Sequence, residues 1–558
     1  IAAARLDSTL AASEAREIYG QMEAGTLKLL YVAPERFNNE RFLALLKRTP
    51  IALLAVDEAH CISEWGHNFR PDYLKLAQTA RDLKVARVLA LTATATPSVV
   101  KDICEAFRIP AGDATVTGFY RPNLNVCLTP VRAEDRDALL VRRLGARRAG
   151  PTIVYVTLQK TAGRLAAYLT AQGFPAEAYH AGMDDELRAQ VQDRWMASDA
   201  GIVVATIAFG MGIDKANVRY VYHYNLPKSL ESYSQEIGRA GRDGAKSTVE
   251  MLACPDDVPT LENFAHGDTP TESALHGLLT ELLAQGPEFD VSVYDLSFRH
   301  DIRMLVLRTA LTYLELRGVL RQGTPFYAGY EVQPLRPLQE ITGEFAGPHG
   351  RFVADIFAHA RRGTKWYALN PDDIAAALDV DRRRVVRALE YLEERGWAQV
   401  RASDVRQRYT RLRESEDIEA LVAELRGRFE KREAQEQARL QQVLDLVTHD
   451  GCQANALVGY FGETRSAPCG HCTHCATGRT AILPPAYEAP PIETLLDLAE
   501  WQALRAAHPA ALGEARQAAR FLCGLGSPAL MRAKLTKHPL FGTLEAMRFG
   551  DVLAWCEN

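Results

Sequence analysis

Two adjacent carboxylates at the end of an apolar run are the residues best placed for chemistry. The run LLAVDEAHC (residues 53–61) sets Asp57 and Glu58 directly after a predicted buried strand. In a nucleotide-driven site the first carboxylate of such a pair can hold Mg²⁺ through its water shell, and the second can polarise the attacking water. The alternative is an acidic pair at a solvated strand end.

Two further motifs follow in an order that favours nucleotide chemistry. In TATAT (residues 92–96) the hydroxyls of Thr92 and Thr94 could link the carboxylate loop to a facing domain. In QEIGRAGRDG (residues 235–244) Arg239 and Arg242 lie three apart, on one face of a helical turn, with glycines on either side. Guanidinium groups so placed suit a γ-phosphate, although a surface pair that binds carboxylates is the alternative. Gln235 opens this motif and joins the predicted catalytic set, as does His60, whose spacing suits signalling between nucleotide and DNA.

These motifs, together with ATIAFGMGIDKANVRYVYHYNLP, resemble superfamily-two helicases and the RecQ family in particular. The resemblance implies ATP with Mg²⁺, 3′-to-5′ travel on single-stranded DNA, and unwinding of duplex or forked DNA in repair or recombination. It also implies that Thr206 contacts a DNA phosphate and that Asp214 couples DNA to ATP. A translocase or annealing factor that does not unwind productively is the alternative.

The segment CISEWGHNFRPDY (residues 61–73) resembles the aromatic-rich loop that RecQ enzymes carry after the DEAH box. Trp65, His67, Phe69 and Arg70 combine flat stacking groups with cations, and stacking on a base is worth roughly 1–3 kcal/mol whatever the base. The loop is therefore expected to sense single-stranded DNA, unless its aromatic residues fill a domain interface.

A phosphate-binding loop of the form G-x-x-x-x-G-K-[ST] does not occur in the sequence. GAKS (residues 244–247) is the closest string but lacks the upstream glycine spacing, and YVAPERF (residues 31–37) resembles a RecQ motif that lies well after the loop. We expect a preceding segment to carry it. A non-enzymatic DNA-binding protein that has lost the loop is the alternative.

Four cysteines have the spacing of a metal site. CGHCTHC contains two C-x-x-C steps that share a middle cysteine, which suits one tetrahedral Zn²⁺ better than disulfides. His471 and His474 are possible substitutes for a thiolate. The cluster resembles the structural zinc site of RecQ proteins. The predicted ligands are Cys452, Cys469, Cys472 and Cys475.

The apolar runs predict an α/β fold, because continuous apolar strands separated by helices are typical of parallel sheets covered on both faces. We expect two RecA-like motor domains, two winged-helix units, a small helical zinc-binding module, and a Pro-rich linker with a small helical segment. An order with tandem winged helices ahead of the zinc site is similar to the Rothmund–Thomson-type branch of RecQ. The predicted ranges are 1–120, 121–265, 270–340, 350–413, 414–480 and 481–558.

Charge and composition limit the partners. The 558 residues carry a formal net charge of −5, so DNA contacts must use local basic surfaces. Residues 381–413 contain ten Arg against five acidic residues, which predicts phosphate binding unless they form a solvated helix face. The sequence contains no long uncharged apolar run, so a membrane span is not expected. We expect a cytoplasmic, nucleoid-associated protein in a prokaryote or a nuclear one in a eukaryote, and the sequence does not identify protein partners.

Overall fold

A computed structural model describes the chain except for residues 7–9, 11, 64–69, 211, 346 and 414–415. Its described residues divide into two compact units. One unit comprises Ile1–Pro50 and Glu272–Ala423, and the other comprises Ile51–Thr271 and Glu424–Asn558. We describe each unit by itself.

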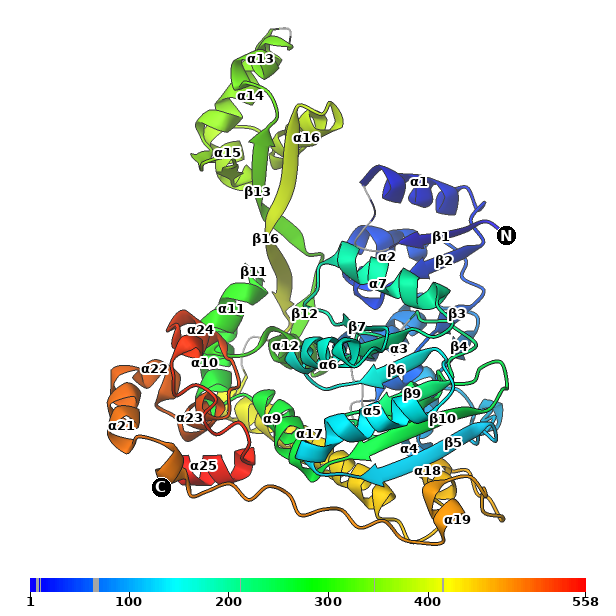
Figure 1. Cartoon of the computed structure of the whole chain (residues 1–558). Helices are drawn as coiled ribbons and strands as arrows, with labels where there is room; N and C mark the ends of the chain where they lie inside the picture. The colour runs from blue at the N-terminus through cyan, green and yellow to red at the C-terminus, as the bar shows by residue number, and fades with distance from the viewer. Residues whose placement is uncertain (7–9, 11, 64–69, 211, 346, 414–415) are drawn as a thin grey trace. The chain divides into compact units, whose positions relative to one another are not determined.

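A six-stranded parallel sheet is the centre of the second unit (Figure 1). Its strand order is β5-β10-β9-β6-β8-β7, and separate apolar clusters pack on its two faces. β6 and β8 are buried at every residue, which explains their unbroken apolar sequences. The strands are β5 (Leu124–Pro130), β6 (Thr152–Tyr155), β7 (Ala176–Tyr179), β8 (Ile202–Ala205), β9 (Tyr220–His223) and β10 (Ser247–Ala253). Four of its helices are α5 (Arg136–Ala146), α6 (Gln159–Ala171), α7 (Asp185–Ala197) and α8 (Leu230–Ile237).

The strands that carry the DEAH and TATAT motifs are short. β3 (Leu54–Val56) pairs in parallel with β4 (Val88–Ala90), flanked in sequence by α3 (Pro71–Asp82) and α4 (Pro97–Phe107). The predicted burial of these runs is wrong, because Leu53 is 51% and Leu91 46% exposed. The reason is that β3 and β4 form a sheet of only two strands among the described residues, too narrow to cover their apolar side chains.

The first unit contains a small parallel pair and a larger antiparallel sheet. β1 (Ala3–Leu6) pairs with β2 (Leu29–Val32), next in sequence to α1 (Ala12–Glu23) and α2 (Glu40–Leu46). Tyr31 of β2 is 64% exposed. The helices around the antiparallel sheet are α10 (Glu272–Leu283), α11 (Val293–His300), α12 (Met304–Leu316), α13 (Leu338–Gly343), α14 (Pro348–Ala358), α15 (Pro371–Leu378) and α16 (Arg382–Glu394).

One long strand serves both predicted winged-helix regions. β16 pairs with β11 and β12 near its end and with β13 along most of its length. The hairpin β14–β15 extends the sheet beyond β13. The two helix-and-strand units therefore share a ribbon instead of carrying separate wings. The strands are β11 (Glu288–Val291), β12 (Leu320–Gln322), β13 (Phe326–Pro334), β14 (Arg361–Arg362), β15 (Tyr367–Leu369) and β16 (Ala398–Arg411).

The cysteine region packs into the core of the six-stranded sheet. α17 (Ile418–Val447) is a long helix, followed by α18 (Gln453–Tyr460) and α19 (Thr473–Thr477). Apolar side chains of α17 and α18, such as Val443 and Leu457, belong to the same buried cluster as those of β5 and β9. This part of the chain is thus fused to the sheet by a common core.

The C-terminal residues form a small helical bundle around a core of their own. The bundle docks on α9 (Val258–Gly267) through stacked rings of His266 and Phe549, 4.5 Å apart. Among the described residues, no helix combines the length and the apolar character needed to cross a membrane. The bundle comprises α20 (Ile492–Leu495), α21 (Leu498–Ala507), α22 (Pro509–Leu512), α23 (Ala515–Leu522), α24 (Pro528–Arg532) and α25 (Phe549–Glu557).

Candidate active site and metal centre

The carboxylate pair lies in a tight turn after β3. Glu58 adopts the left-handed conformation (φ 50°), which is uncommon for residues other than glycine and costs of order 1 kcal/mol or more. Asp57 Oδ1 accepts a hydrogen bond from the Glu58 amide (2.9 Å), and the Ala59 amide donates to Leu91 O (2.8 Å). Burial raises the pKa of Glu58 above its usual value and the charge of Asp57 adds to this effect, while Arg70 and Arg239 oppose it.

His60 connects the DEAH turn to the TATAT motif. Its Nδ1 lies 2.9 Å from Thr92 Oγ1 and 3.3 Å from Glu58 Oε2. Thr92 Oγ1 also accepts a hydrogen bond from the Thr94 amide (3.2 Å). Burial lowers the pKa of His60 to about 4, with a further contribution from Arg70, so the imidazole is neutral at pH 7. The two motifs therefore form one hydrogen-bonded unit.

The arginine pair lies in the turn that follows α8. Arg239 is nearly buried, and its Nη1 donates to Gly210 O (2.6 Å). A Cβ at position 210 would lie 2.9 Å from Arg239 Nη2, so a larger residue there would displace this guanidinium group. Arg242 is more exposed and donates to Asp214 Oδ1 (2.9 Å) and Ile213 O (3.3 Å). Both guanidinium groups are thus held against the loop that follows β8.

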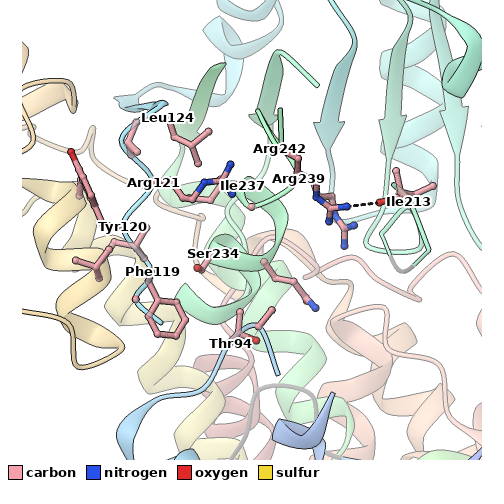
Figure 2. Close-up of a pocket in the computed structure, with 18 of the residues that line it drawn as sticks. Thr94, Phe119, Tyr120, Arg121, Leu124, Ile213, Ser234, Ile237, Arg239 and Arg242 are labelled. Carbon is pink, nitrogen blue, oxygen red and sulfur yellow. Dashed lines mark hydrogen bonds between the residues drawn. The ribbon is translucent and has the colours of Figure 1, made fainter. Parts of the chain in front are cut away.

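One cavity of about 500 Å³ brings these motifs together (Figure 2). Glu58 and Thr94 line it from the DEAH and TATAT motifs, and Gln235, Arg239 and Arg242 line it from the arginine motif, with Asp214 beside them. Asp57, His60, Thr92 and Thr206 are not among its lining residues. Among the described residues, Thr94 Oγ1 and Arg239 Nε are buried without a hydrogen-bond partner. Polar atoms left in this state fit a polar, anionic ligand such as a nucleotide phosphate.

The predicted DNA-contact residues are less completely placed. Trp65, His67 and Phe69 lie outside the described residues. Arg70 is exposed at the start of α3, and its amide donates to Cys61 O (3.2 Å). Thr206 is mostly buried, with its amide bound to Tyr179 O (3.2 Å). The DNA-contact roles of these residues remain predictions.

The four predicted metal ligands converge. All four Sγ atoms lie within 4.8 Å of one another, and those of Cys469 and Cys475 are 3.9 Å apart. Sulfurs placed about 2.3 Å from a central zinc, at tetrahedral angles, are about 3.8 Å apart. Backbone amides of Cys472 and Cys469 donate to neighbouring sulfurs at 3.2 and 3.3 Å, as suits thiolates. Cys452 is the N-cap residue of α18.

The two histidines of the cysteine motif have partners elsewhere. His471 Nε2 lies 2.9 Å from the hydroxyl of Tyr120, and His474 Nε2 lies 3.6 Å from Asp450 Oδ1. The geometry therefore favours a site made of four thiolates over one that includes a histidine.

Sequence reasoning overlooked the segment Gly118–Asn123, which also lines the cavity. Arg121 Nη2 donates to the carbonyls of Ala240 and Gly241 at 3.2 and 3.0 Å. Glu463, far along the chain, accepts hydrogen bonds from backbone amides of the same segment. Glu463 ends the string YFGE before the cysteine cluster, which resembles the RecQ zinc site, but nothing in that string indicates a contact with Arg121 or its neighbours.

Family models match three parts of the chain. DEAD/DEAH box helicase matches residues 2–103, helicase conserved C-terminal domain matches residues 135–244, and RecQ zinc-binding matches residues 403–476. The first two matches place the chain among proteins with paired helicase domains, which is the class that the sheets and the cavity define.

Curated relatives narrow this class. The ATP-dependent DNA helicase RecQ of Bacillus subtilis (strain 168) is 41% identical over 259 residues, which cover 46% of this chain and 44% of the relative. RecQ-like DNA helicase blm-1 of Caenorhabditis elegans is 40% identical over 280 residues, covering 48% and 28%. ATP-dependent DNA helicase Q-like 5 of Arabidopsis thaliana is 34% identical over 324 residues, covering 56% and 36%. The matched regions make up less than half the length of these relatives. Together with the zinc-binding match, they show that the chain belongs to the RecQ helicase family.

Proposed function

We propose that this protein is an ATP-dependent DNA helicase that travels 3′ to 5′ along single-stranded DNA and unwinds duplex or forked DNA. The observation that carries the proposal is the cavity that joins Glu58 to Gln235, Arg239 and Arg242. Carboxylate and guanidinium groups from distant motifs meet there, as ATP hydrolysis requires. The names of the curated relatives support the same activity.

ATP is the substrate that fits this arrangement. Asp57 would hold Mg²⁺, which when bound neutralises phosphate charge. Glu58 orients the attacking water and accepts its proton, and its raised pKa suits a general base. Arg239 and Arg242 stabilise the charge that develops on the γ-phosphate. Asp214 couples the DNA-contacting loop to this charge, a role supported by its ion pair with Arg242.

Four cysteine thiolates support zinc as a structural metal. The site shares its core with the six-stranded sheet, so bound zinc would stabilise the second helicase domain as well as its own segment.

Duplex DNA has a candidate binding surface on the antiparallel sheet. Arg361 and Arg362 of β14 and Lys365 of the turn that follows are exposed. On α16, Arg383 and Arg387 are exposed, whereas Arg382 pairs with Asp372. Exposed cations of this kind suit phosphate contacts that do not depend on sequence.

A strand-displacement assay tests the proposal. The full-length gene product is mixed with forked duplexes that carry only a 3′ tail or only a 5′ tail, with and without ATP, beside an ATPase assay. We expect displacement that needs ATP and the 3′ tail. ATP turnover without displacement on either substrate would indicate a translocase, and displacement from the 5′ tail alone would contradict the direction.

A further inference from the structure

The segment Gly118–Asn123, here called the strap, connects the cysteine region to the arginine turn. It leads into β5, and its residues Gly118–Arg121 line the cavity. Figure 2 draws Phe119, Tyr120 and Arg121 together with Ile237, the last residue of α8, among the residues that line the cavity. The two ends of the strap have different partners.

The first end of the strap is bound by residues next to the metal site. Glu463 Oε2 accepts hydrogen bonds from the amides of Phe119 and Tyr120, the latter at 3.0 Å. The rings of Phe119 and Phe461 stack 4.3 Å apart. The hydroxyl of Tyr120 shares a hydrogen bond with His471, which lies between two of the cysteine ligands in sequence. The centre of the Tyr120 ring lies 3.3 Å from the guanidinium carbon of Arg465. Backbone and side chains of the strap are thus both fixed by the cysteine region.

The second end of the strap binds the arginine turn. Arg121 donates to the carbonyls of Ala240 and Gly241, and Asn123 Nδ2 donates to Gly241 O at 2.8 Å. Gly241 has a positive φ of 57°, and a Cβ there would lie 2.5 Å from Asn123 Nδ2. The turn between Arg239 and Arg242 is therefore clamped at its two middle carbonyls by the strap.

We infer that Arg121 and Asn123 are positioning residues for Arg239 and Arg242. We also infer that Glu463, by holding the strap, makes the position of the two arginines at the ATP site depend on the folding of the zinc region. The inference rests on the proposed function, because it concerns the arginines' role toward a γ-phosphate. A displacement of about 1 Å in a catalytic group can lower the rate about a hundredfold. Releasing the clamp should therefore slow turnover without removing any group assigned to the chemistry.

The test compares four variants of the full-length protein in DNA-stimulated ATP hydrolysis. Asn123→Ala and Arg121→Ala should each lower kcat by roughly ten- to a hundredfold while KM for ATP stays within about threefold. Glu463→Ala should lower kcat in the same sense. Glu463→Gln should recover most of it, because the amide oxygen still accepts from both backbone amides. Arg188→Ala, on the surface of α7 with Asp185 as its partner, is the control and should match wild type.

Zinc content and the thermal midpoint, measured for every variant, separate positioning from misfolding. Combining Arg121→Ala with Glu463→Ala should cost less than the product of the two single effects, because both release one strap. Multiplicative effects, a KM increase without a kcat loss, or wild-type kcat in Asn123→Ala would overturn the inference. The variant Arg242→Ala distinguishes a failure of this inference from a failure of the proposed function. If it is inactive while strap variants are normal, only the inference fails, and if it is active, the proposed role of the arginines fails.

Discussion

The two arginines of the turn should differ in what they contribute to stability, although both are assigned to the same chemistry. Arg239→Ala removes two nearly buried methylenes, worth about 1.6 kcal/mol. It also leaves Gly210 O without its donor, at about 1–3 kcal/mol. Regained side-chain entropy offsets up to about 2 kcal/mol. The expected net loss is therefore about 1–5 kcal/mol.

Arg242→Ala should cost much less. Its partner Asp214 is 88% exposed, and exposed ion pairs contribute about 0–1 kcal/mol. Urea unfolding followed by circular dichroism measures both free energies of unfolding on this chain. ATP turnover in the full-length protein should fall by about a thousandfold or more for either variant. An equal loss of stability in both variants, or normal turnover in Arg242→Ala, would refute this reasoning.

The metal site, the contact between Glu433 and the C-terminal bundle, and the aromatic-rich loop of the sequence each give one further prediction. Metal analysis of purified protein should find about one zinc per chain, and Cys475→Ser should lower both the zinc content and the thermal midpoint; an unchanged metal content would argue against four thiolate ligands. Burial alone would raise the pKa of Glu433, but hydrogen bonds from His266 and Arg516 lower this pKa to about 2. The ionised Glu433 carboxylate therefore contributes its full stabilisation above about pH 4.3, and this stabilisation is lost as the pH falls toward 2. Glu433→Gln should therefore destabilise the docked C-terminal bundle by about 3–5 kcal/mol at pH 7 and flatten its acid transition in fluorescence-monitored unfolding, and an acid transition like that of wild type would contradict this. Trp65→Ala should weaken the stimulation of ATPase by single-stranded DNA, and undiminished stimulation would count against a sensing loop.

Much of the second helicase domain can be predicted from sequence because its strands are continuous apolar runs. β6 and β8 are buried on both faces, and only apolar residues fit there. β7 (AEAY) was not predicted, since a short strand with a charged residue has no clear period. The four cysteine ligands were predictable because their spacing is itself the signal of the chemistry.

Other features depend on contacts that no local pattern encodes. Glu463 meets the strap across more than three hundred residues, and neither partner stands in a motif that requires the other. The apolar runs near Leu53 and Leu91 predict burial, but burial depends on which other strands and helices cover them. β16 reads as a single wing, although its length lets it pair with three different strands.

Strand separation is proposed to be driven by ATP hydrolysis at the cavity between Glu58 and the arginine turn. The most direct test measures ATP turnover and displacement of a labelled strand in one reaction, for the full-length wild type and for Glu58→Gln. We expect the variant to bind DNA with near-normal affinity but neither to turn over ATP nor to displace the strand. Strand displacement by the variant at the wild-type rate would contradict this expectation.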